Sequence, residues 1–117
     1  MKKLLVAAGC LGLMLAGQTL LAQGKGKGKG APAGNAQAGK ELFEANCSVC
    51  HNADSTERKM GPGLKGLFMH EKLVNGQAVN DANVQMFIDM GGNGMPGFAD
   101  LLIPAEKADL IAYLKSL

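Results

Sequence analysis

Two cysteines and a histidine near the middle of the chain could together hold a metal or a cofactor. They occur as Cys47-Ser48-Val49-Cys50-His51, an order typical of covalent haem c attachment. Residues i and i+3 lie on the same side of a helical turn, so both thiols could add to the vinyl groups along one edge of a porphyrin. His51 could then give a ring nitrogen to the iron.

The same residues allow two other interpretations. A thioredoxin-like redox pair needs a βαβ context, and no strand pattern surrounds these cysteines. A zinc site needs further N or S ligands, and the other candidates are His70 and Cys10, of which Cys10 lies in a segment with the pattern of a signal peptide. The sequence favours haem c and leaves the zinc site and the redox pair open.

The beginning of the chain has the pattern of an export signal. Lys2 and Lys3 precede an apolar run from Leu4 to Ala16, and small residues suitable for cleavage follow up to Ala22. We therefore expect a signal peptide over residues 1–22 that is cleaved, and a periplasmic location. Contact with the membrane is expected only if the leader is retained as an anchor.

Composition changes after this leader. Glycine and lysine alternate over the next residues, so 23–34 is expected to be a flexible linker, and 35–117 one small domain. From Asn35 onward seven Lys and Arg stand against ten Asp and Glu, so the domain is near −3 although the full chain is +2. Nothing in it indicates a basic face for nucleic acid. With four Phe, one Tyr and no Trp, its core is thin, and a covalently held haem would stabilise it.

Apolar residues recur at helical spacing in three segments, and no stretch alternates as a strand would. We expect one helix from about Ala36 into the cysteine motif, one over Asp81–Met90 with Asn80 as its N-cap, and one beginning near Pro104. The fold class is therefore all-α, with three to four helices wrapped around a haem. Gly39 lies inside the first helix, where glycine costs about 1 kcal/mol, and close approach of a second helix would explain it.

A glycine-rich turn, Gly61-Pro62-Gly63-Leu64, follows the cysteine motif. A histidine ligand needs an acceptor that orients its second ring nitrogen, and the carbonyl of Pro62 is the natural candidate. Leu64, with Leu67 and Phe68, would pack against the haem. An ordinary turn with core residues remains the alternative.

From about Gln37 to Leu117 the chain resembles a bacterial class I cytochrome c. Besides the motifs above, the resemblance rests on Met95-Pro96-Gly97-Phe98 and on a last helix that contains Tyr113. It implies a small cytochrome c fold in which the first and last helices cross at Gly39, Phe43 and Tyr113.

The resemblance also implies a set of site residues. One covalent haem c would be held by Cys47 and Cys50, and its iron by His51 and Met95. Pro62 and Leu64 would lie in the haem pocket, and no residue would be catalytic.

Other side chains could take the second axial position. Met95 follows Gly94 and precedes Pro96, and such a loop can present a thioether to the iron. Met86 and Met90 lie one helical turn apart and are expected at the edge of the core. His70 is expected at the surface, and ligation by two histidines is the alternative.

Function follows from this coordination. A His/Met haem has no open position, and the thioether raises the reduction potential. We expect an exported one-electron carrier between redox proteins, which is no enzyme and takes neither a small-molecule substrate nor nucleic acid. One alternative is a dedicated haem c subunit of a periplasmic dehydrogenase or terminal oxidase complex. A second, less favoured alternative is a haem sensor or peroxidase, which would need a histidine or arginine in the haem pocket; Arg58 is the only arginine in the chain.

Overall fold

The computed structural model describes residues 33–117. It contains α1 (Ala36–Asn46), the short 3-10 helix η1 (Leu67–Met69), α2 (Asp81–Met90) and α3 (Pro104–Leu114). Apart from two isolated bridges, these residues form no strand pairing, so the predicted all-α class is confirmed. No helix within 33–117 has the length and apolar character needed to cross a membrane. The predicted signal peptide and most of the predicted linker lie outside the described residues.

Each α-helix begins where a side chain or a proline satisfies its first turn. The Asn35 side chain accepts hydrogen bonds from two backbone N–H groups of α1, and the Asn80 side chain accepts one from Asn83 in α2. These caps occupy donors that have no partner inside a helix. In α3, Pro104 takes the first position. The starts predicted for the second and third helices are confirmed.

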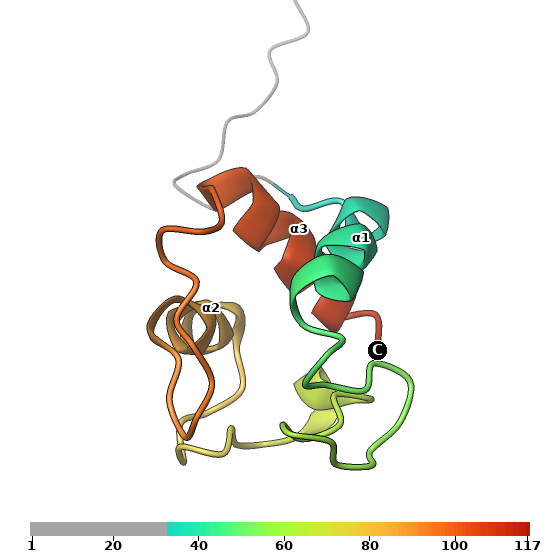
Figure 1. Cartoon of the computed structure of the whole chain (residues 1–117), viewed down its shortest axis with the longest axis vertical. Helices are drawn as coiled ribbons and strands as arrows, with labels where there is room; N and C mark the ends of the chain where they lie inside the picture. Colours follow the sequence, from blue (N-terminus) through green and yellow to red (C-terminus); the bar gives the residue numbers. More distant parts are fainter. Residues whose placement is uncertain (1–32) are drawn as a thin grey trace, which may run out of the picture.

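The first and last helices cross at a glycine. Figure 1 shows α1 packed against α3, whereas α2 meets α3 over a much smaller contact. Gly39 is buried in the crossing, where a Cβ would collide with the Asp109 carbonyl and lie 2.8 Å from Tyr113 Cβ. The rings of Phe43 and Tyr113 meet beside it, with centroids 5.5 Å apart and planes inclined by 60°. Close approach of a second helix therefore explains the glycine, as expected.

One cluster of buried apolar side chains joins the three helices. Its members are Phe43, Val84, Ile88, Leu102, Leu110, Ile111 and Leu114. The expectation that Met86 and Met90 form an edge of this core is wrong, because these residues are 46% and 76% exposed. At about 100° per residue, the face that buries Val84 and Ile88 turns both methionines away from the cluster.

Two long connections carry the residues that the sequence singled out. Residues 47–66 join α1 to η1 and hold the cysteine motif. Residues 91–103 join α2 to α3 and hold Met95. In Figure 1 these connections, drawn in green and orange, lie on different sides of the molecule, next to α1 and α2 respectively.

Candidate haem-binding site

The cysteine motif continues α1 as one further turn. The Cys47 N–H donates to the Phe43 carbonyl at 2.8 Å, and the N–H groups of Cys50 and His51 both donate to the Cys47 carbonyl, at 3.0 and 2.9 Å. Both cysteines are half-buried, and neither forms a disulfide within the described residues. The turn therefore offers two free thiols followed directly by an imidazole.

Burial raises the pKa of the Cys47 thiol to about 11, and the nearby Cys50 thiol acts in the same direction. A reactive dithiol needs the opposite shift, because the thiolate is the nucleophile and positive surroundings lower its pKa. This environment argues against a thioredoxin-like redox pair.

The imidazole of His51 is oriented by the following turn. Its Nδ1 lies 2.8 Å from the carbonyl oxygen of Pro62, the acceptor that the sequence predicted. A hydrogen bond at Nδ1 places the proton there and leaves Nε2 as a lone-pair donor, which is the tautomer that a metal-bound histidine needs.

The turn is fixed to the cysteine motif by its backbone and by contact with the ring. The Gly61 N–H donates to the Cys50 carbonyl at 2.8 Å, and the Leu64 N–H donates to the Asn52 carbonyl at 2.8 Å. A Cβ at Gly61 would lie 2.7 Å from Nδ1 and 2.9 Å from Nε2 of His51. A larger residue at this position would therefore displace the ring. Leu64 packs against the core cluster from the same turn.

The loop after α2 presents Met95 from a tight turn. The N–H groups of Gly92 and Met95 each donate to the other residue's carbonyl at 3.0 Å. Between them, Asn93 and Gly94 have φ of 53° and 88°, as a type I′ turn requires, and Asn-Gly is the pair that this turn prefers. Met95 is half-buried and packs against the core cluster.

The other described side chains considered for the site are exposed. His70 and Arg58 are exposed. Met60 is 75% exposed, with its sulfur 3.8 Å from Cys50 Sγ. Within residues 33–117, no group of three His, Cys, Asp or Glu side chains could hold a metal ion, so these residues offer no zinc site. Cys10 lies outside them.

The donors of the cysteine turn fit a covalently attached haem. Two free thiols sit on one helical turn, and the adjacent imidazole has one nitrogen occupied by a carbonyl and the other available. Gly61 leaves that ring the space in which it lies.

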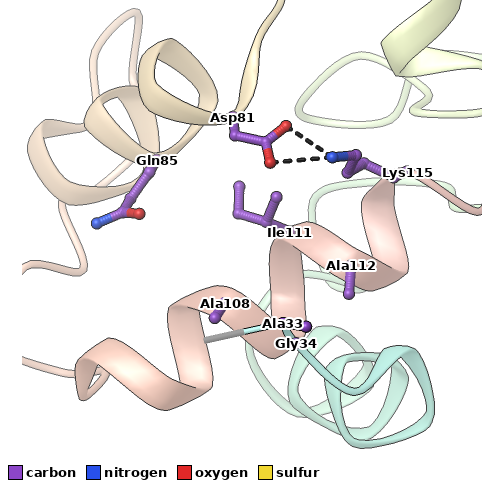
Figure 2. Close-up of a pocket in the computed structure, with 8 residues that line it drawn as sticks. All are labelled: Ala33, Gly34, Asp81, Gln85, Ala108, Ile111, Ala112 and Lys115. Carbon is purple, nitrogen blue, oxygen red and sulfur yellow. Dashed lines mark hydrogen bonds and ion pairs between the residues drawn. The ribbon is translucent and has the colours of Figure 1, made fainter. Parts of the chain in front are cut away.

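A groove of about 400 Å³ lies between α2, α3 and residues 33–34 (Figure 2). None of the cysteines, histidines or methionines considered for the haem lines this groove.

Comparison with known proteins agrees with this geometry. Residues 34–114 match the family model described as cytochrome c oxidase, cbb3-type, subunit III. Cytochrome c of Gossypium barbadense is 36% identical over 102 residues, covering 73% of this chain and 92% of its own length. The chain is a small class I c-type cytochrome. Cytochrome c of Chlamydomonas reinhardtii is 37% identical, covering 73% of this chain and 91% of that protein.

The fold of this cytochrome is also found among solved structures. Cytochrome c6 from the diatom Phaeodactylum tricornutum superposes with a TM-score of 0.56 and 27% identity, covering 71% of this chain and 93% of the other. As a member of the family, the cytochrome carries one covalently bound haem c with its iron. It is an electron carrier, and its partners are redox proteins.

Sequence reasoning gave no role to one buried contact of this cytochrome. Lys107 of α3 is 8% exposed, and its Nζ lies 2.7 Å from Asp89 Oδ1 in α2. The available signal was a lysine at a position where α3 otherwise faces the core, three residues before Leu110.

Proposed function

We propose that this cytochrome is an exported carrier that moves single electrons between redox proteins of the periplasm. Cys47 and Cys50 would hold the haem c through thioethers, and His51 and Met95 would hold its iron. The hydrogen bond of 2.8 Å between His51 Nδ1 and the Pro62 carbonyl carries this proposal, because it leaves Nε2 available to iron.

The roles of the chain's own residues follow from simple chemistry. When bound, the haem supplies a one-electron ferric/ferrous couple. If both His51 and Met95 held the iron, no position would remain for a small-molecule substrate. A thioether raises the potential relative to a second imidazole. Pro62 fixes the imidazole, and Leu64 is an apolar wall that limits water near the cofactor.

Export is supported by the residues before the described part. The basic and apolar pattern of residues 1–22 is that of a signal peptide, which leaves a linker over 23–34 and the cytochrome domain over 35–117. The mass of the protein from the periplasmic fraction tests this assignment. A mature chain beginning at Gln23 is expected, and a mass that includes residues 1–22 would instead indicate a retained anchor.

The ligand assignment is tested by comparing two methionines. Met95→Ala should abolish the long-wavelength sulfur-to-iron charge-transfer band of the ferric protein and allow the ferrous protein to bind carbon monoxide. Met90→Ala is the matched control, since Met90 is 76% exposed. It should keep the band and change the unfolding free energy by about 0.5 kcal/mol or less. A wild-type protein without the band would overturn His/Met ligation.

A second candidate function has one observation in its favour. The family model that matches residues 34–114 is described as a subunit of a cbb3-type oxidase, so the chain could serve as a dedicated haem subunit of such a complex. Affinity purification from solubilised membranes separates the two functions. A carrier should be recovered alone, whereas a subunit should be recovered with oxidase subunits in fixed stoichiometry.

A further inference from the structure

The Met95 loop comprises residues 91–97, and the backbone at its exit, residues 98–99, is attached to the last turn of α2. The Phe98 N–H donates to the Ile88 carbonyl at 2.9 Å, and the Ala99 N–H donates to the Asp89 carbonyl at 3.2 Å. Gly97 makes this approach possible, because a Cβ there would lie 2.6 Å from the Asp89 carbonyl oxygen. The backbone beyond Met95 therefore lies directly on the end of the helix.

One side chain from α3 joins these two parts. The ammonium of Lys107 is 2.7 Å from Asp89 Oδ1 and donates to the carbonyl of Ala99 at 3.0 Å. Lys107 is 8% exposed. It therefore contacts the helix that precedes the loop and the residue that leaves the loop.

Lys107 is the cationic partner of one carboxylate oxygen of Asp89. Its Oδ1 is enclosed, and apart from the Lys107 ammonium no donor among the described residues reaches it. Removing Lys107 would leave this enclosed oxygen without a donor, an unfavourable state, while the Asp89 side chain as a whole is 26% exposed. Asp89 would then have to turn toward water, and its backbone carbonyl is an anchor of the loop exit.

A second ion pair links α2 to the residue after α3, but it is exposed and does not contact the Met95 loop exit. Lys115 Nζ lies 3.0 and 2.9 Å from the two carboxylate oxygens of Asp81 (Figure 2). Asp81 is the first residue of α2, whereas the Met95 loop follows its last residue. The side chains of Lys115 and Asp81 are 49% and 61% exposed. Exposed pairs contribute little to stability, so this pair is a natural control.

We infer that Lys107, through Asp89 and the Ala99 carbonyl, is a positioning residue that keeps the Met95 loop closed on the haem. It acts by lowering the population of a state in which the loop exit has left α2. The inference rests on the proposed ligation by Met95, since only a ligand loop has a closed and an open state that the iron can report.

The test uses the haem-loaded full-length protein and two readouts. The first is hydrogen exchange at the Phe98 and Ala99 amides, which reports release of the loop from α2 whatever ligates the iron. The second is the dissociation constant of imidazole for the ferric protein. An external ligand binds only the open state, so its apparent affinity scales with the population of that state.

Lys107→Met should raise both amide exchange rates and the imidazole affinity by about tenfold or more, a factor that corresponds to about 1.4 kcal/mol. Lys115→Met should leave both within about twofold. Leu114→Ala, a truncation in the α1–α3 core, should lower the denaturation midpoint without changing the imidazole affinity, which separates positioning from general stability.

The other outcomes separate a failure of the positioning role of Lys107 from a failure of the proposed ligation by Met95. If Lys107→Met behaves as Lys115→Met or as Leu114→Ala, the positioning role is overturned, and Met95 ligation is judged separately by the charge-transfer band of Met95→Ala. If the amides exchange faster but imidazole affinity is unchanged and Met95→Ala keeps the charge-transfer band, the proposed ligation is what fails. Should Lys107→Met not give folded protein, Asp89→Asn keeps the side-chain shape and is judged by the same two thresholds.

Discussion

Replacing Gly61 with alanine should disturb the proposed iron ligand directly. The new Cβ would lie 2.7 Å from Nδ1 and 2.9 Å from Nε2 of His51, so either the ring or the turn must move. The ring cannot turn freely, because its Nδ1 is bonded to the Pro62 carbonyl at 2.8 Å and its other nitrogen is assigned to the iron.

The expected magnitude follows from two terms. Inserting a methyl group into a packed site costs about 1–3 kcal/mol, and losing the hydrogen bond to Pro62 costs about 0.5–1.5 kcal/mol. The unfolding free energy of the haem-loaded protein should therefore fall by about 1.5–4.5 kcal/mol. The reduction potential should also rise, because a histidine without this acceptor is a less basic ligand to the iron.

Guanidinium unfolding followed at the haem absorbance, together with a redox titration, measures both effects. Gly76→Ala is the control: its Cβ would meet nothing within 4 Å, and its φ of 84° costs about 1–2 kcal/mol in strain alone. That variant should leave the potential unchanged. The reasoning is refuted if Gly61→Ala keeps its potential and loses less than about 0.5 kcal/mol.

Three further changes test the fold and the site. Gly39→Ala should lower the unfolding free energy by about 1–3 kcal/mol, measured by denaturation, because its Cβ would meet the Asp109 carbonyl and Tyr113 Cβ; an unchanged midpoint would contradict the close crossing. Replacing both Cys47 and Cys50 with alanine should remove haem staining from the denatured band, and staining that persists would disprove the attachment site. Electron transfer with a basic partner should slow as salt rises, over a screening length of about 8–10 Å near physiological ionic strength, because residues 35–117 carry more acidic than basic side chains; stopped-flow rates that rise with salt would indicate an acidic partner.

Features that depend on neighbours in sequence were predictable. Asn80 and Pro104 predict the starts of α2 and α3. The unpaired backbone N–H groups of a first helical turn are dealt with locally, either by a side-chain oxygen that accepts from them or by a proline that has no N–H. Orientation of His51 by the Pro62 carbonyl was predictable for a related reason. A histidine ligand needs an acceptor, and a glycine-rich turn soon after it can bring a carbonyl back to the ring.

Features that depend on contacts between distant residues, or on which side of a helix a residue faces, could not be predicted from the sequence. Lys107 and Asp89 belong to different helices, and a lysine in an amphipathic segment is usually solvated, so nothing local indicated their burial together. Met86 and Met90 were expected at the edge of the core because they lie one helical turn apart, but at about 100° per residue they lie on the side of α2 away from the buried Val84 and Ile88.

The crossing of α1 and α3 has a consequence for how the protein is made. The two helices stand at opposite ends of the domain sequence, with both long connections and α2 between them. The entropy of closing so long a stretch of chain must be lost before the contact between α1 and α3 can stabilise the fold. A chain that emerges from its N-terminus therefore completes the cysteine turn well before the helix that covers α1 is available. During that interval the two thiols lack the burial that raises the pKa of Cys47 in the folded domain, so the Cys47 thiol ionises more readily before the domain closes than after.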